Sequence, residues 1–212
     1  MLRVYYTELT EPFREDCPFP LSEYRRQKLS KVKAPSLRRQ MIAAEWLLIK
    51  AVRDYAPQTT LPLEITCAER GKPRFRELPL CFSLSHSGPF VACAIADHEI
   101  GLDIQATVQD KAFLAERFFS AEEKHFLLEQ RDQNRAFTAL WALKESYLKA
   151  TGEGLSRELD GFSVDPECLA LRENREVSFW RFSDARFELA LCALDGCSPN
   201  PEFIISTELR PD

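Results

Sequence analysis

Residues 141–149 read Trp141-Ala-Leu-Lys-Glu-Ser-Tyr-Leu-Lys149 and lie within a predicted helix over residues 133–151. Glu145 and Lys149 are four residues apart, so they share one face of that helix. Trp141 and Leu148 fall on the same face, which is therefore predicted to point inward. A carboxylate on an inward face needs a partner, and a metal ion is a suitable one. The alternative is an exposed ion pair between Glu145 and Lys149, which would contribute only about 0.3–0.5 kcal/mol.

A second carboxylate stands some forty residues earlier, where an apolar strand ends in Gly101-Leu-Asp103-Ile-Gln105. Alternate residues of a strand share a face, so Asp103 and Gln105 can point into one cleft. A carboxylate and an amide oxygen are hard ligands that suit Mg²⁺, which takes further oxygens from water or a substrate phosphate. The alternative is an aspartate that caps a turn at the end of a strand.

Two further segments could bind an anion. The sequence Phe82-Ser-Leu-Ser85-His86-Ser-Gly88 predicts a strand that runs into a small-residue turn, where backbone N–H groups, hydroxyls and an imidazole can hold phosphate oxygens. The other segment is a concentration of basic residues, for which the alternative is an ordinary solvated helix face. Its members are Arg25, Arg26, Lys28, Lys31, Lys33, Arg38 and Arg39, with Lys72 and Arg74 farther along the chain.

The composition of the chain limits the class of protein. Its 212 residues are 45% hydrophobic, which suffices for one sizeable core or for two halves that share an interface. The net charge of −5 disfavours a general nucleic-acid binder. The seven cysteines are scattered and include no CxxC pair, so a zinc ribbon or a disulfide framework is not expected. No apolar stretch reaches the ~18–20 residues of a membrane span, and no signal peptide is recognisable. We therefore expect a cytoplasmic protein with no membrane or nucleic-acid partner.

Strand and helix patterns alternate on both sides of residue 100, which predicts an α+β fold. Strand patterns cover residues 2–8, 63–68, 81–85, 90–96, 100–104, 161–164, 177–182, 187–194 and 203–207, and helical patterns follow residue 22 and cover 36–55, 111–118, 120–131 and 133–151. The short link at residues 97–99 predicts that strands 90–96 and 100–104 form an antiparallel hairpin. No Gly/Ser linker divides the halves, so two closely packed α+β lobes are expected, over residues 1–100 and 101–212.

Five motifs in this chain, in their order, resemble the surfactin-synthetase-activating type of 4'-phosphopantetheinyl transferase. That family shows Gly-Lys-Pro, Asn-(Ile/Leu)-Ser-His-Ser, Gly-(Ile/Val)-Asp-Ile-Glu, Arg-Phe-Phe-Ser and Trp-x-x-Lys-Glu-(Ala/Ser)-x-x-Lys. The corresponding sequences here are Gly71-Lys-Pro73, Ser83-Leu-Ser-His-Ser87, Gly101-Leu-Asp-Ile-Gln105, Arg117-Phe-Phe-Ser120 and Trp141-Ala-Leu-Lys-Glu-Ser-Tyr-Leu-Lys149. The resemblance covers about residues 25–164, and five motifs at matching intervals make it specific.

The resemblance implies a monomeric, Mg²⁺-dependent transferase. Such an enzyme moves the 4'-phosphopantetheine arm of coenzyme A to a serine of an acyl or peptidyl carrier protein of fatty acid, polyketide or nonribosomal peptide synthesis, and releases adenosine 3',5'-bisphosphate. It also implies two similar lobes related by a pseudo-twofold axis with the site between them. Residues 1–100 would form the coenzyme A side, and residues 101–212 the metal and catalytic side. The carrier is a transient, acidic partner, so a locally basic and partly apolar dock is expected. Its apolar part could come from Phe113, Phe118, Phe119 and Phe126.

The resemblance also assigns roles to individual residues. Asp103 and Glu145 would ligate Mg²⁺, and Gln105, where the family often has Glu, would ligate it through the amide oxygen or hold its water. Glu145 would take the proton of the serine, directly or through a metal-bound water. Lys149 and Lys144 complete the catalytic set, with Lys144 holding the phosphates or the geometry of the site. The residues expected to contact coenzyme A are His86, Ser85, Lys149, Lys72, Arg39, Lys31 and Lys33.

Two alternatives remain open at this point. The first is a non-catalytic module that binds coenzyme A or a carrier protein, which Gln105 alone favours. The second is a metal-dependent nuclease that uses Asp103 with Glu145 and Lys149. Its usual Glu-x-Lys spacing is absent, and the acidic balance of the chain also disfavours it.

Overall fold

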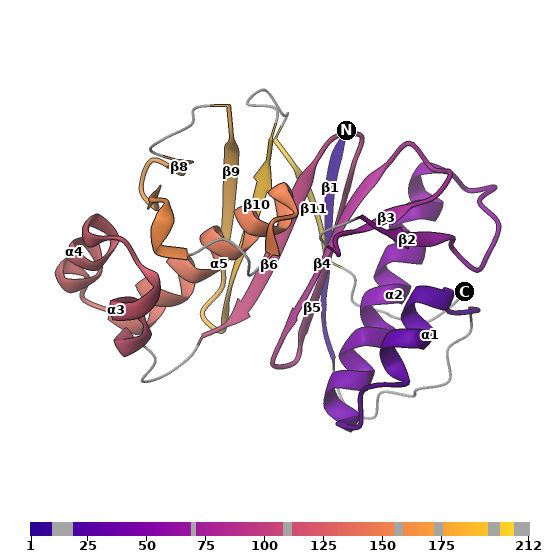
Figure 1. Ribbon diagram of the computed structural model, residues 1–212, viewed down its shortest axis with the longest axis horizontal. Coiled ribbons are helices and arrows are strands. Elements are labelled where there is room, and N and C mark those ends of the chain that lie inside the picture. Colours follow the sequence, from indigo (N-terminus) through magenta and orange to yellow (C-terminus); the bar gives the residue numbers. More distant parts are fainter. Residues whose placement is uncertain are drawn as a thin grey trace.

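Two sheets and two long helices form four layers in the computed structural model of the chain (Figure 1). The structure describes residues 1–9, 19–68, 71–107, 112–154, 159–171, 176–194 and 200–205. The first sheet has the order β11-β1-β5-β4 and the second has the order β6-β10-β9. Their strands are β1 (Leu2–Glu8), β4 (Cys81–Ser87), β5 (Phe90–Ala96), β6 (Ile100–Ala106), β9 (Ser178–Ser183), β10 (Phe187–Ala193) and β11 (Glu202–Ile205). The fold is a mixed one of helices and sheets, as the sequence predicts.

The central core lies between the two sheets. Alternate residues of β1, such as Val4, point into it and meet apolar residues of β6 and β10, such as Leu102 and Leu189. The rings of Phe90 and Phe187 lie with their centroids 4.6 Å apart across this boundary. Every residue of β5 and of β10 is buried, because each of these strands has a sheet on one face and a helix on the other. The two sheets therefore share one continuous apolar layer.

Each outer face is covered by one long helix. Helix α2 (Pro35–Tyr55) packs on the first sheet through residues such as Leu47 and Leu48, and the short α1 (Glu23–Leu29) packs on α2. Helix α5 (Gln133–Thr151) packs on the second sheet and ends at Gly152, which has a φ of 72°. A left-handed residue after a helix is the usual glycine C-terminal signal. Among the described residues, no helix has the length and apolar character needed to cross a membrane.

Smaller elements fill the edges of the molecule. They are the paired strands β2 (Ile65–Cys67) and β3 (Pro73–Phe75), the 3-10 helices η1 (Ala112–Leu114) and η3 (Leu159–Gly161), the helices α3 (Ala115–Phe118) and α4 (Ala121–Glu129), and the paired strands β7 (Val164–Asp165) and β8 (Ala170–Leu171). Helix α4 begins with a capping box, in which Ser120 and Glu123 bond each other's backbone N–H groups. The predicted strand over 161–164 is instead the end of η3 followed by β7.

One prediction about strand pairing is wrong. The expected hairpin does not form, because β5 pairs with β1 and β4 whereas β6 pairs with β10 in the other sheet. Residues 97–99 are therefore a crossing between sheets. Both strands are apolar on two faces, so their periodicity could not indicate their neighbours. Strand β11 also pairs in parallel with β1, and so the end of the expected 101–212 lobe lies in the first sheet.

Candidate active site

Helix α5 lies directly on β6, and this contact brings the two carboxylates of the sequence motifs together. A Cβ atom added to Gly101 would stand 2.0 Å from the carbonyl oxygen of Ser146 and 2.3 Å from the backbone nitrogen of Ala150. Only glycine permits such an approach between a strand and a helix backbone. Two residues farther along β6, Asp103 therefore faces the part of α5 that carries Glu145 and Lys149.

The Asp103 carboxylate is buried and accepts hydrogen bonds from three side chains. Its Oδ1 atom accepts from Lys149 Nζ at 2.5 Å and from the Ser85 hydroxyl at 2.7 Å. Its Oδ2 atom accepts from Gln105 Nε2 at 2.8 Å. Lys149 also donates to Ser85 at 3.0 Å. A carboxylate that is 2% exposed requires such partners, and here they join β4, β6 and α5 at one point.

Serine hydroxyls join β4 to β6, which belong to different sheets. Ser83 Oγ accepts from the backbone N–H of Leu102 at 2.9 Å, and Ser87 donates to Gln105 Oε1 at 3.3 Å. With Ser85, these are alternate residues of β4, so all three hydroxyls lie on its β6 side. Both ends of the Gln105 amide are thereby used within the protein.

The Glu145 carboxyl differs from that of Asp103 in having no hydrogen-bond partner among the described residues. Burial raises the pKa of Glu145 above its usual value, and the negative charge of Asp103 raises it further, while Lys149 lowers it in part. The ionised form is thus disfavoured in the free protein. A cation bound between the two carboxylates would reverse this cost.

We expect the change Glu145→Gln to stabilise the free protein. Because folding raises the pKa of this carboxyl, its ionised form costs folding free energy above the ordinary glutamate pKa of 4.5. The variant should therefore unfold at a higher temperature at pH 7.5 in the presence of EDTA. The difference should shrink as the pH falls towards 4.5, where the folded parent binds the proton.

Thermal unfolding between pH 4.5 and 7.5 measures this effect. The matched control is Glu129→Gln, which changes an exposed glutamate of α4. A parent protein that is more stable than the Glu145→Gln variant at pH 7.5 would contradict the burial of this charge.

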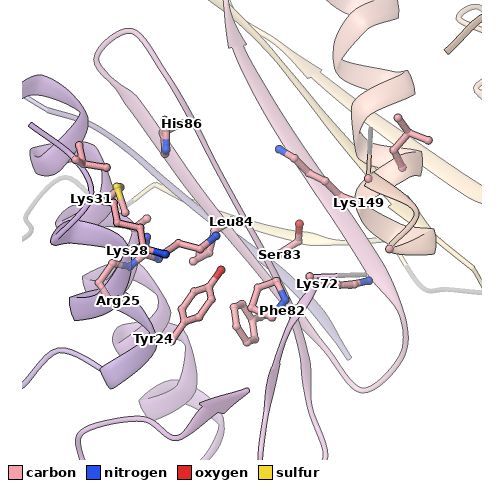
Figure 2. A pocket seen from close by; sticks show the side chains of 18 residues that line it. Tyr24, Arg25, Lys28, Lys31, Lys72, Phe82, Ser83, Leu84, His86 and Lys149 are labelled. Carbon is pink, nitrogen blue, oxygen red and sulfur yellow. The ribbon is translucent and has the colours of Figure 1, made fainter. Parts of the chain in front are cut away.

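A pocket of ≈ 640 Å³ adjoins the buried carboxylates (Figure 2). Helix α1 forms one wall, and the end of α5 forms the opposite wall. The floor is the face of β4 that carries Phe82, Leu84 and His86. The lining includes five cationic side chains and, within the described part of the chain, no carboxylate. The five are Arg25, Lys28, Lys31, Lys72 and Lys149. In a protein of net charge −5, this pocket is a local concentration of positive charge that is suited to an anion.

One cation of the pocket is fixed by a fully buried carboxylate. Glu45, on α2, accepts from the backbone N–H of Ser22 at 3.0 Å and from Arg25 Nε at 3.2 Å. Arg25 is itself buried, and its Nε is used by Glu45, so its terminal nitrogens remain as donors for a ligand. Lys28 stands over the ring of Tyr24, with Nζ 4.9 Å from the ring centroid. Helix α1 thus presents preorganised cations to the pocket.

His86 lines the same pocket from β4 (Figure 2). Burial lowers the pKa of its imidazole below the usual value, and the positive charges of Lys149 and Arg25 lower it further. The neutral ring can donate one hydrogen bond to a phosphate oxygen while leaving the charge of the pocket to the lysines and Arg25.

Comparison with known proteins shows the family. A family model described as the 4'-phosphopantetheinyl transferase superfamily matches residues 99–193, the segment that contains Asp103, Glu145 and Lys149. The 4'-phosphopantetheinyl transferase ffp of Bacillus subtilis is 35% identical over 156 residues, which are 69% of this chain and 70% of that protein. This chain belongs to the 4'-phosphopantetheinyl transferase superfamily. The resemblance that the five motifs indicated is thereby confirmed.

Two further transferases of this superfamily, both from Bacillus subtilis, match shorter parts of the chain. One 4'-phosphopantetheinyl transferase is 35% identical over 150 residues, 67% of this chain and 66% of that protein. The 4'-phosphopantetheinyl transferase Sfp is 42% identical over 105 residues, 48% of this chain and 47% of that protein. The chain thus matches between about half and two thirds of the length of these two relatives.

Several residues that the resemblance assigned to the site of a phosphopantetheinyl transferase do not line the pocket. Lys33 and Arg39 are not among the residues that line the pocket. Lys144 is fully buried and binds both carboxylate oxygens of Glu123, at 2.7 and 2.8 Å, so it does not join Asp103. Ser85 meets Asp103 rather than the pocket.

Among the cations that line the pocket, Arg25 and Lys28 received no individual role from the resemblance, although both belong to the basic cluster that the sequence offered as an anion site. The signal in the sequence was the helical spacing of Lys28 with its neighbours, because Tyr24, Lys28 and Lys31 follow one another at four and three residues. The buried partner Glu45 was not detectable, since nothing in the pattern of α2 distinguishes it from an exposed residue.

The residues around Asp103 fit the magnesium ion that the superfamily implies. Asp103 and Glu145 supply two carboxylates, and the raised pKa of Glu145 shows that this carboxyl would gain from a neighbouring cation. Gln105 would have to turn its amide, because its nitrogen donates to Asp103 and its oxygen accepts from Ser87. Among the described residues no group of three or more His, Cys, Asp or Glu side chains could hold a metal, so further ligands would come from water or substrate.

Proposed function

We propose that this protein transfers the 4'-phosphopantetheine arm of coenzyme A to a serine of an acyl or peptidyl carrier protein. The observation that carries the proposal is the pocket beside Asp103, Glu145 and Lys149, which is lined by five cations and by no carboxylate among the described residues. Membership of the superfamily supports the same reaction. The other product is adenosine 3',5'-bisphosphate.

In the proposed complex, the phosphates of coenzyme A lie along the cations of the pocket. Arg25, Lys28 and Lys31 on the α1 side are suited to the phosphates of the adenosine part, because Arg25 offers a fixed fork of donors. His86 and Lys149 lie on the side nearer Asp103 and are suited to the diphosphate. Lys149 would then donate to a phosphate oxygen as well as to Asp103.

The reaction forms a bond from the serine oxygen to the phosphorus that carries the pantetheine arm. The bond from that phosphorus to the bridging oxygen breaks, and its electron pair leaves with adenosine 3',5'-bisphosphate. Mg²⁺ held by Asp103 and Glu145, with Gln105 as a further oxygen ligand, would neutralise charge on the diphosphate. Glu145 takes the serine proton, directly or through a bound water.

The surface beside α4 is proposed as the carrier dock. Phe113 and Leu128 are 70% and 73% exposed, which is unusual for large apolar side chains. Phe119, in contrast, is a core residue that stacks on Phe137, and Phe118 and Phe126 are partly buried in the same cluster. Of the four phenylalanines considered, Phe113 thus has the most surface to offer a partner.

The proposal includes a cytoplasmic monomer that meets its acidic carrier transiently and has no nucleic-acid or membrane partner. The net charge of −5 supports the exclusion of nucleic acid. It also includes two similar lobes related by a pseudo-twofold axis. The packing of α2 on the first sheet and α5 on the second supports that relation (Figure 1).

Intact mass of an apo carrier protein tests the proposal. Incubation with this protein, coenzyme A and Mg²⁺ should add the mass of one phosphopantetheine arm. Glu145→Gln should slow the transfer about 10²–10⁴-fold, the usual contribution of a general base. Glu64→Gln, at an exposed position away from α4 and the pocket, should not change it.

No mass gain with fatty-acid, polyketide and peptidyl carriers would overturn the transferase proposal. If coenzyme A still bound under those conditions, the non-catalytic binding module would replace it. Cleavage of a plasmid in Mg²⁺ would favour the nuclease instead.

A further inference from the structure

Lys72 lines the pocket with its stem, but its ammonium group is turned towards α5 and away from α1 (Figure 2). Its Nζ atom lies 2.8 Å from Glu99 Oε2, 3.0 Å from the carbonyl oxygen of Ile100 and 2.8 Å from that of Ala150. An ammonium group has three N–H donors. All three are therefore used within the protein, and the side chain is only 9% exposed.

The three acceptors belong to parts of the chain that define the site. Glu99 lies in the crossing between the two sheets, and Ile100 begins β6, the strand of Asp103. Ala150 is in the last turn of α5, where carbonyl groups have no partner within the helix. A cation there also interacts favourably with the helix dipole. The stem of Lys72 packs beside the residue that ends α5, because a Cβ on Gly152 would stand 3.3 Å from Lys72 Cδ.

We propose that Lys72 is a positioning residue for the catalytic end of α5. It ties the last turn of that helix to the crossing between the sheets and so fixes Lys149 and Glu145 relative to Asp103. Lys149 is the neighbour of Ala150, and Glu145 is little more than one turn before it. The catalytic part of this inference rests on the proposed transferase function, whereas the structural part does not.

The competing role for Lys72 is the phosphate contact that the family resemblance suggested. To bind a phosphate oxygen, the ammonium would have to release one of three protein acceptors. Glu99 would also remain beside the phosphate, because an ion pair of its second oxygen with Arg74, at 2.5 Å, holds the carboxylate in place. The two roles therefore predict opposite effects of neutralising Glu99. If Lys72 binds a phosphate, loss of the Glu99 charge should strengthen coenzyme A binding. If Lys72 positions α5, the same change should weaken its hold on the helix and lower kcat.

Steady-state kinetics and calorimetric binding of coenzyme A separate these roles. We expect Lys72→Met and Glu99→Gln each to lower kcat at least 10-fold while changing the Kd for coenzyme A less than 3-fold. The kcat of the double variant should be no lower than that of Lys72→Met alone, because both changes break the same connection. Lys28→Met is the reference, and it should raise the Kd instead.

Hydrogen exchange of the free protein gives a readout that does not need the transferase reaction. Amide exchange at residues 148–152 should accelerate at least 10-fold in Lys72→Met and in Glu99→Gln, while residues 136–142 of the same helix keep the exchange rates of the parent. If Lys72→Met does not fold, the Glu99→Gln variant carries the test alone.

Tighter coenzyme A binding by Glu99→Gln, or a large rise in Kd with unchanged kcat in Lys72→Met, would overturn the proposal. Unchanged exchange at residues 148–152 would also overturn it. If transfer is not observed at all, only the proposed function fails, and the exchange experiment still decides whether Lys72 holds α5.

Discussion

Replacement of Gly101 by alanine is expected to remove at least ~3 kcal/mol from the free energy of unfolding. The added Cβ would stand 2.0 Å from Ser146 O and 2.3 Å from Ala150 N, both of them backbone atoms of α5. Backbone atoms of a helix cannot turn aside as the end of a long side chain can. Helix α5 would have to move away from β6, and the carboxylates of Asp103 and Glu145 would separate with it. Urea denaturation of the parent and the variant measures the loss.

The matched control for this prediction is Gly161→Ala. A Cβ at Gly161 would meet no atom within 4 Å, and its backbone is not in the left-handed region. That change should alter stability by no more than about 0.5 kcal/mol. A Gly101→Ala variant as stable as the control would show that α5 and β6 can separate without cost, and the close approach would lose its structural role.

The second large effect is expected for Lys144→Met, at about 3–5 kcal/mol of lost stability. Lys144 is fully buried, and its Nζ donates to both oxygens of Glu123 and, at 2.6 Å, to the carbonyl oxygen of Phe162. Glu123 also accepts from the backbone N–H of Val164 at 2.8 Å. Removing the ammonium leaves a buried carboxylate without its counter-ion, which is costlier than losing the contact itself. Chemical denaturation at pH 7 measures the change.

A neighbouring lysine on the surface provides the control for Lys144→Met. Lys124 forms an ion pair with the exposed Glu116 at 3.5 Å, so Lys124→Met should cost no more than ~1 kcal/mol. A Lys144→Met protein that keeps its stability but loses transfer would support the catalytic role that the family resemblance gave to Lys144. Loss of stability instead identifies Lys144 as the residue that ties α5 to the start of α4.

The sequence was sufficient to locate the elements and motifs that carry the site. Helical spacing placed Glu145 and Lys149 on one face of α5, and strand alternation placed Asp103 and Gln105 on one face of β6. The Ser-x-x-Glu sequence from Ser120 and the glycine at Gly152 are local signals of the same kind, and the structure contains the capping box and the helix end that they specify. These features depend on residues that lie close together along the chain, so local periodicity and backbone preference decide them.

The partners of the buried charged groups were decided only by the tertiary structure. Lys72, Lys144 and Arg25 were all read as potential phosphate ligands, because a lysine or arginine near a glycine-rich turn or a basic helix gives no sign of its partner. Two of them are held by carboxylates about 20 residues away, and Lys72 by groups 27, 28 and 78 residues away. Such partners are brought together by packing of the core, which sequence spacing does not encode.

The pairing of strands shows the same division between local and distant information. The sequence by itself determined that residues 90–96 and 100–104 are strands, that α5 has an inward face and that five motifs identify the superfamily. Only the tertiary structure decided that β5 and β6 enter different sheets and that β11 returns to β1. Strands that are apolar on both faces can pair with several neighbours. The choice among these neighbours depends on how the two sheets and their helices bury the most apolar surface together.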